Sequence, residues 1–201
     1  MEIASFRIIY SKNEKQLGVT KNFEKAILKC TGDIVFLCDQ DDVWLPGKIH
    51  EILNIFEFDE DVGLVFSNAH VTDSNLNSFG YTMWDVVGFN RKKQHTASKG
   101  NALSILVKSD VATGATMAFR ANLIKYIFPI PSLCFHDAWI TFIATTVSKI
   151  VAIEKPLILY RQHDANIIGG RRISLFQHIQ KSIHISPQWF DNEILRSNNL
   201  L

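Results

Sequence analysis

The chain has 201 residues, 47% of them hydrophobic, and a formal net charge of +1 at pH 7. This length is typical of one domain, and the apolar content is sufficient for a buried core. The near-neutral charge gives no electrostatic footprint for nucleic acid, and no apolar run reaches the ~18 residues that a membrane span needs. We expect a cytoplasmic protein, because its N-terminus does not resemble a signal peptide and its three cysteines indicate reduced core thiols rather than disulfides or a zinc site.

The first third of the chain alternates between strand and helix patterns. Residues 6–10 predict a first strand, and Thr20 is positioned to cap a helix whose apolar residues recur at helical spacing. Residues 34–38 form an apolar run that is too short for a buried helix and rich in β-branched and aromatic side chains. This run predicts a strand that is buried on both faces of a parallel sheet.

Three carboxylates, Asp39, Asp41 and Asp42, follow that strand directly. Ligands of parallel sheets bind at the carboxyl ends of the strands, and like charges at close range are costly unless a cation neutralises them. A divalent metal ion that carries a phosphate would satisfy this arrangement. The alternative is a solvated turn in which Asp41 or Asp42 caps the next helix.

The middle of the chain predicts a helix, a strand and a long loop. Pro46 suits the first turn of a helix with one apolar face, and residues 64–67 predict the next parallel strand. The pattern then becomes polar over residues 73–100, which indicates a long loop with some local helix. Tyr81 and Trp84 in this loop could stack on a sugar ring, but local packing is the more common role of such aromatics.

Two further segments combine small or polar residues with a predicted element. Gly114 lies within residues 111–119, which have strand character, and a glycine there marks either close approach of a ligand or tight packing. Asp137 falls in the first turn of a predicted helix, where the exposed amides and the helix dipole stabilise an anion. His136 either caps this helix or orients a substrate.

The last third predicts one more strand and a basic tail. Residues 157–161 have strand character, and His163 follows them; a single histidine at such a place is usually a surface or structural residue. From residue 171 onward, apolar residues at near-helical spacing alternate with arginine, lysine and histidine. Such an amphipathic helix can lie on an anionic membrane surface or pack back on the domain.

Taken together and in order, these segments resemble the family 2 glycosyltransferases with a GT-A fold, especially bacterial rhamnosyltransferase-like members. The resemblance covers about residues 6–170, and the residues that carry it are 18–23, 32–44, Lys48, 113–117, 136–139, 156–163 and Asn166. It implies an α/β, GT-A-like (Rossmann-like) fold with a mostly parallel sheet flanked by helices. Residues 1–170 would form a partial GT-A domain and residues 171–201 a C-terminal amphipathic helical tail.

The resemblance also implies an activity. This activity is the metal-dependent transfer of a sugar, with inversion, from a nucleoside-diphosphate donor to a saccharide or lipid-linked acceptor. The transfer would belong to bacterial surface polysaccharide synthesis, and rhamnose is a candidate for the sugar. Asp137 would be the general base. Asp39, Asp41 and His163 would hold Mn²⁺ or Mg²⁺. The donor and acceptor would contact Asp42, Trp44, Gly114, His136 and Arg161, although Arg161 could instead pair with a core carboxylate.

The sequence departs from the family at its N-terminus. Members normally begin with a further strand, helix and strand that contact the base and ribose of the donor, whereas this chain starts at what resembles a later strand. We therefore expect an N-terminally truncated domain whose exposed sheet edge is covered by a partner or by self-association. The alternative to an active enzyme is a non-catalytic remnant, or a carbohydrate- or metal-binding module, without the nucleoside pocket.

Two expectations about place and chemistry complete the prediction. An enzyme with a lipid-linked acceptor and a basic tail would work in the cytoplasm, at the inner face of the membrane when the tail binds there. A phosphoryl-transfer enzyme that uses the same carboxylates is disfavoured, because no phosphate-cradling glycine loop with lysine and serine or threonine is present in the sequence.

Overall fold

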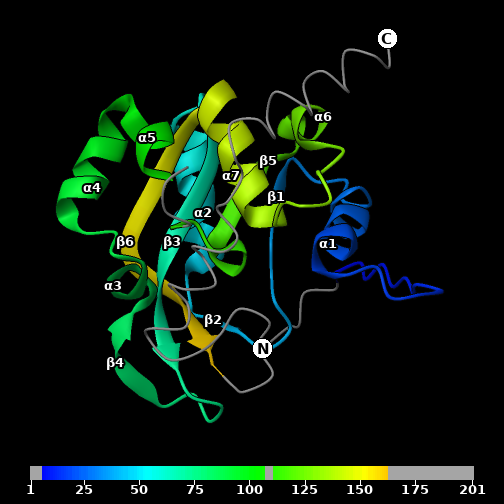
Figure 1. Cartoon of the computed structure of the whole chain (residues 1–201), viewed down its shortest axis with the longest axis horizontal. Coiled ribbons are helices and arrows are strands. Elements are labelled where there is room, and N and C mark those ends of the chain that lie inside the picture. Colours follow the sequence, from blue (N-terminus) through cyan, green and yellow to red (C-terminus); the bar gives the residue numbers. More distant parts are fainter. Residues whose placement is uncertain (1–5, 107–110, 163–201) are drawn as a thin grey trace.

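The computed structural model describes residues 6–106 and 111–162. In this part, helices flank one mixed sheet (Figure 1). The strands are β1 (Ile34–Phe36), β2 (Val43–Trp44), β3 (Val62–Thr72), β4 (Ser78–Thr82), β5 (Met117–Arg120) and β6 (Lys149–Arg161). Their order is β1-β5-β3-β6-β2, with β4 paired to β3 outside this path.

The α helices and shorter turns lie between these strands. The α helices are α1 (Val19–Ile27), α2 (Lys48–Phe58), α3 (Met83–Val87), α4 (Arg91–Thr96), α5 (Ala102–Leu106), α6 (Ile124–Ile127) and α7 (His136–Val147). A kinked segment, Ala97–Asn101, joins α4 to α5, because Lys99 and Gly100 have non-helical backbone angles. Two 3₁₀ turns, Gly114–Thr116 and Ala121–Leu123, flank β5. No helix among residues 6–106 and 111–162 is both long enough and apolar enough to span a bilayer.

The central strand β3 separates two hydrophobic layers. Its side chains alternate between the two faces of the sheet, as in any strand. Leu64 and Phe66 belong to a cluster that includes Ile140 of α7, whereas Val65 packs with Ile52 of α2. The two helices thus cover opposite faces of the sheet, and β3 is buried along almost its whole length, including the polar residues Ser67, Asn68 and Thr72.

The α/β class is confirmed, but the mostly parallel sheet is wrong. Of the five strand pairings in the described residues, only β3 with β6 is parallel. The strand predicted over residues 34–38 is the short edge strand β1, which runs antiparallel to β5. The sequence pattern was misleading because an apolar run reports burial and carries no information about strand direction.

The predicted strand over residues 6–10 is also wrong. These residues are irregular, and Phe6 and Tyr10 are 75% and 83% exposed. Among the described residues no strand pairs with this segment, so its backbone lacks the ladder of hydrogen bonds that defines a strand. Its β-branched and aromatic composition therefore has no structural consequence here.

The remaining elements agree in type, with shifted bounds. Helix α1 begins after Gly18 rather than at a Thr20 cap, because the Thr20 hydroxyl donates instead to the carbonyl of Cys134 at 3.1 Å. The strands predicted over 64–67 and 157–161 are parts of the longer β3 and β6. The long loop predicted over 73–100 is wrong: local helix is present as expected in α3 and α4, but the segment also contains the strand β4, and Trp84 is buried.

The cysteine prediction is half right. All three cysteines are free thiols, as expected. Cys134 is buried, but Cys30 and Cys38 are exposed, because each lies beyond the end of its helix or strand rather than inside it. The predicted tail over residues 171–201 lies outside the described residues.

Candidate functional site

The acidic loop after β1 lies against the end of β6. The backbone N–H of Arg161 donates to Oδ1 of Asp42 at 3.0 Å, and the Arg161 Nε donates to the carbonyl oxygen of Asp41 at 2.8 Å. A third donation, from the guanidinium to the carbonyl of Ser74, ties the turn after β3 to the same arginine. The Arg161 side chain thus holds the acidic loop through backbone carbonyls, and its bond to the Asp42 carboxylate comes from the backbone. Contact of this side chain with a diphosphate or with a core carboxylate stays a prediction.

The loop carboxylates are electrostatically strained. Burial raises the pKa of Asp42 to about 7, with Asp39 and Asp41 adding to the shift and the bond from Arg161 opposing it. Burial also raises the pKa of Asp39, and the carboxylates of Asp41 and Asp137 raise it further, while His136 lowers it. Oδ2 of Asp42 is buried without a hydrogen-bond partner in the described residues. Such a site stabilises a bound cation or hydrogen-bond donor.

A buried lysine connects this loop to the turn that contains Gly114. Lys48, at the start of α2, is 1% exposed; its Nζ lies 4.1 Å from the ring centroid of Trp44 and donates to the carbonyl of Ala115 at 2.8 Å. Burial lowers the pKa of Lys48 to about 8, although Cys38 and Asp42 act in the opposite direction. Trp44 is thus a packing partner of Lys48, and its Nε1 is buried without a partner in the described residues.

Asp137 is held by two backbone amides. Its Oδ2 accepts from the N–H of Gly114 at 3.1 Å and its Oδ1 from the N–H of Ala138 at 2.9 Å. The first bond comes from a 3₁₀ turn that approaches closely because Gly114 has no side chain: an added Cβ would lie 3.0 Å from Nε2 of His136. Of the two predicted explanations of Gly114, tight packing is therefore present, and close approach of a ligand stays a prediction.

His136 is enclosed at the start of α7. Its ring stacks on Phe23 of α1, with centroids 3.9 Å apart and planes 9° from parallel. The side chain is 6% exposed, and neither ring nitrogen has a hydrogen-bond partner in the described part of the chain. Burial lowers the pKa of His136, although Asp137 and Asp39 raise it, so a neutral ring with one donor and one acceptor faces the site.

The described candidates therefore form one neighbourhood. The contacts connect Asp42, Arg161, Trp44, Gly114, His136 and Asp137 directly or through Lys48, and Asp39 and Asp41 interact through their charges. His163 lies outside the described residues. Within the described part, no group of three or more histidine, cysteine, aspartate or glutamate side chains is arranged to hold a metal ion.

Sequence reasoning missed three residues of this neighbourhood. All three, Lys48, Phe23 and Tyr160, lie in segments that match the family, but none of them was predicted to be a site residue. Burial and the four nearby carboxylates raise the pKa of Tyr160. The direct adjacency of Tyr160 to Arg161 was a possible signal, but no local pattern could place Phe23 against His136, which is 113 positions away.

Comparison with known proteins gives matches over most of the chain. The family model described as glycosyl transferase family 2 matches residues 2–128. An uncharacterized glycosyltransferase of Nostoc sp. is 25% identical over 79% of this chain and 47% of that protein. A dTDP-rhamnosyl transferase of Shigella flexneri is 24% identical over 92% of this chain and 62% of that protein. The chain thus spans about half to three fifths of these relatives.

A solved structure supports the fold. The crystal structure of glucosyl-3-phosphoglycerate synthase from Mycobacterium tuberculosis in complex with phosphoglyceric acid superposes with a TM-score of 0.50 at 14% identity. The match covers 86% of this chain and 57% of that one. The predicted GT-A-like α/β fold is thereby confirmed.

Proposed function

The chain belongs to glycosyl transferase family 2, and on this basis we propose that it transfers a sugar from a nucleoside-diphosphate donor to an acceptor hydroxyl with inversion at the anomeric carbon. The proposed donor sugar is rhamnose, by analogy with the dTDP-rhamnosyl transferase of Shigella flexneri. The proposed acceptor is a saccharide or a lipid-linked saccharide of a bacterial surface polysaccharide. Asp137 is the proposed general base.

The observation that carries this proposal is the orientation of the Asp137 carboxylate. Two backbone N–H groups fix both of its oxygens, so the carboxylate has a single orientation at the N-terminus of α7. It is close enough to Asp39 to raise the pKa of that carboxyl group. A base that is fixed next to the acidic loop is the arrangement that transfer from a diphosphate-linked donor requires.

The proposed step has a simple balance of bonds. Asp137 takes the proton of the acceptor hydroxyl as that oxygen forms a bond to the anomeric carbon. The bond between the anomeric carbon and the diphosphate oxygen breaks on the opposite side, and the electron pair leaves with the diphosphate. His136, with unpartnered nitrogens beside Asp137, is the proposed hydrogen-bond partner of the reacting sugars.

The proposed cofactor is a divalent metal ion at the acidic loop. The crowded carboxylates and the buried, unpartnered Oδ2 of Asp42 are the residue types and environment that a hard cation stabilises. Mg²⁺ and similar ions commonly bind through one or two carboxylates together with substrate phosphates, so Asp39 and Asp41 suffice, and His163 is a further proposed ligand. When bound, the ion would offset the charge of the leaving diphosphate.

The decisive experiment compares Asp137→Asn with the wild type in a transfer assay that uses a panel of nucleotide sugars including dTDP-rhamnose. Asparagine keeps the size of the side chain but cannot take a proton, so we expect kcat to fall by about 10²- to 10⁴-fold. Asp61→Asn is the control, because that side chain is 76% exposed and pairs with Lys149 at 3.0 Å. Wild-type activity of Asp137→Asn, in a variant with an unchanged melting temperature, would overturn the assignment.

A second experiment tests the metal. Calorimetric titration of the protein with a nucleoside diphosphate should show binding that Mn²⁺ strengthens, and Asp41→Asn should abolish the effect of Mn²⁺ while the fold is kept. Binding of the nucleotide with no dependence on Mn²⁺ would refute the metal site but leave the base intact. Metal-dependent binding without any transfer would favour the alternative of a non-catalytic module.

A further inference from the structure

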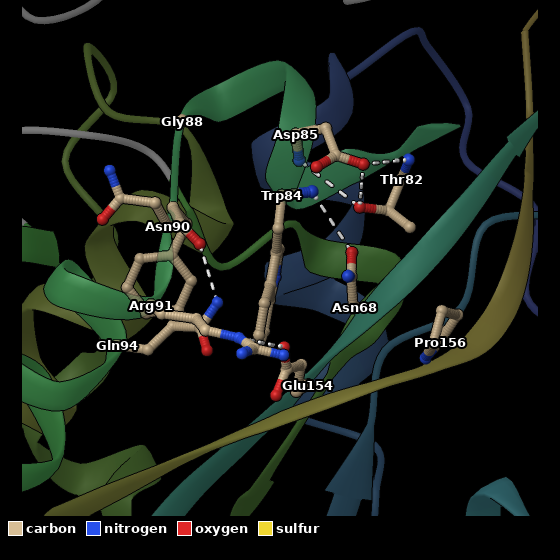
Figure 2. Close-up of a pocket in the computed structure, with 11 residues that line it drawn as sticks. Asn68, Thr82, Trp84, Asp85, Gly88, Asn90, Arg91, Gln94, Glu154 and Pro156 are labelled. Carbon is tan, nitrogen blue, oxygen red and sulfur yellow. Dashed lines mark hydrogen bonds and ion pairs between the residues drawn. The ribbon is translucent and has the colours of Figure 1, made fainter. Parts of the chain in front are cut away.

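A cavity of about 540 Å³ lies on the sheet away from the acidic loop, between α3, the start of α4 and the middle of β6 (Figure 2). It opens where β6 bulges against β3: Ser67 pairs with Ile153 and the next residue, Asn68, pairs with Pro156. The two intervening residues, Glu154 and Lys155, have no paired residue in β3. Bulges of this kind redirect side chains next to sites, and here Glu154 turns into the cavity wall.

Two amide side chains in the cavity wall have fixed orientations. Asn68 is 5% exposed, and its Oδ1 accepts from the N–H groups of Ala69 at 2.9 Å and Trp84 at 3.2 Å. Because an oxygen must face these two donors, the Nδ2 group is directed elsewhere, and it has no hydrogen-bond partner in the described residues. Gln94 is fixed in the same way, because its Nε2 donates to the carbonyl of Phe89 at 2.8 Å and leaves Oε1 without such a partner.

The rest of the wall is apolar or electrically balanced. Trp84, Phe89 and Pro156 supply apolar surface. At the mouth, Arg91 and Glu154 form an exposed ion pair with 3.7 Å between Nε and Oε1, and the Asp85 carboxylate accepts from Thr82 (Figure 2). Among the described residues the cavity has one cation beside two carboxylates, which is no concentration of positive charge for a phosphate group.

From this combination we propose that the cavity is a second carbohydrate site, which binds a neutral sugar residue. Hydroxyl groups both donate and accept, so one sugar can use the free donor of Asn68 and the free acceptor of Gln94. The carbon faces of its ring can pack on the apolar part of the wall. The volume falls in the range of small-molecule sites, which combine apolar walls with a few convergent polar groups.

The site is separate from the proposed transfer site but adjoins the same packing layer. Met83, which precedes Trp84, belongs to the hydrophobic cluster that also contains Ala115, and Ala115 accepts the bond from Lys48. Binding of a sugar in the cavity does not depend on transfer, so the two proposals can fail independently.

The test is a titration of ¹⁵N-labelled protein with methyl glycosides of neutral sugars, followed by NMR of the side-chain amides of Asn68 and Gln94. We expect saturable shifts of both amides with at least one glycoside. Asn68→Asp keeps the acceptor that faces Ala69 and Trp84 but replaces the free donor, and Gln94→Leu removes the free acceptor. Each should weaken binding by about tenfold or more.

Two control variants test whether the effect is specific to the cavity. Lys155→Gln changes the neighbouring residue of the same bulge, whose side chain pairs with Glu51 of α2 at 2.6 Å rather than with the cavity wall, and should leave binding unchanged. Asp137→Asn should also bind the glycoside normally. Three results would each overturn the proposal. The first is no shift of the amide signals with any glycoside, and the second is wild-type affinity in both Asn68→Asp and Gln94→Leu. The third is stronger binding of inorganic phosphate than of every glycoside.

Discussion

Replacement of Gly114 by alanine should separate activity from stability. The new Cβ would lie 3.0 Å from Nε2 of His136 and 3.5 Å from both Cβ and Oδ2 of Asp137. Carbon and neighbouring heavy atoms prefer separations of about 3.5–4.0 Å, so a displacement of about 0.5 Å is needed. His136 has little room to provide it, because its other side stacks on Phe23 at 3.9 Å.

The displacement should therefore move the Gly114 turn away from α7. The bond from the Gly114 N–H to Asp137 would lengthen from 3.1 Å to roughly 3.6 Å, beyond the limit of a hydrogen bond. A misplacement of 1 Å in an active site can cost about 10²-fold in rate, so half of that displacement should lower kcat by about tenfold. The free energy of unfolding should change by less than about 1 kcal/mol, because Gly→Ala stabilises through the unfolded state and the lost bond costs a similar amount.

The assay measures kcat for sugar transfer together with urea denaturation. Gly32→Ala is the matched control, since an added Cβ there would meet only the carbonyl oxygen of Ile34 at 3.8 Å. The backbone of both glycines lies outside the left-handed region, so alanine introduces no strain of its own. Full activity of Gly114→Ala would refute the view that this turn orients Asp137. The same conclusion would follow if Gly32→Ala lost as much activity as Gly114→Ala.

Three further changes test other parts of the structure. The pKa of Lys48 in the folded protein is about 8, below its ordinary value of 10.5, so between these pH values the unfolded state binds more protons and the free energy of unfolding rises with pH. Lys48→Met should remove about 3 kcal/mol of this rise, measured by denaturant titrations at several pH values. An unchanged pH profile would contradict the burial of the Lys48 charge. Arg161→Lys cannot make the bonds to both Asp41 and Ser74 and should weaken donor binding by about tenfold in calorimetry, whereas equal affinity would show that the acidic loop does not need this support. Ile52→Ala truncates a fully buried side chain under β3 and should lower the free energy of unfolding by about 2–5 kcal/mol. Ile49→Ala, on the exposed side of α2, should lower it far less. Equal losses in the two variants would contradict the packing of α2 on the sheet.

The local elements and the cluster of candidates were accessible from the sequence. Helices α1, α2 and α7 follow from apolar residues at helical spacing, and the position of Asp137 in the first turn of α7 follows from the start of that pattern. The ordered motifs indicated the family, which the family model confirms. These features are local, so the sequence around each residue contains the information that determines them.

Pairing and direction were not accessible in the same way. Nothing local distinguishes the antiparallel edge strand β1 from a central parallel strand, and nothing local shows that residues 6–10 have no partner. The bulge of β6 that opens the cavity depends on its register against β3, which is set by contacts across more than 80 positions of the chain. Strand register is a property of the whole sheet.

Some features of the candidate site are visible in the sequence alone: three aspartates after a strand, a glycine in a small-residue segment, and an aspartate at the start of a helix. How these groups meet depends on contacts between segments that are distant in the chain. The tertiary structure placed the Gly114 amide on Asp137, the Arg161 backbone on Asp42, and the buried Lys48 between the acidic loop and the turn. The sequence specifies the type of each side chain directly, whereas hydrogen bonds between distant segments form only after the sheet has aligned those segments.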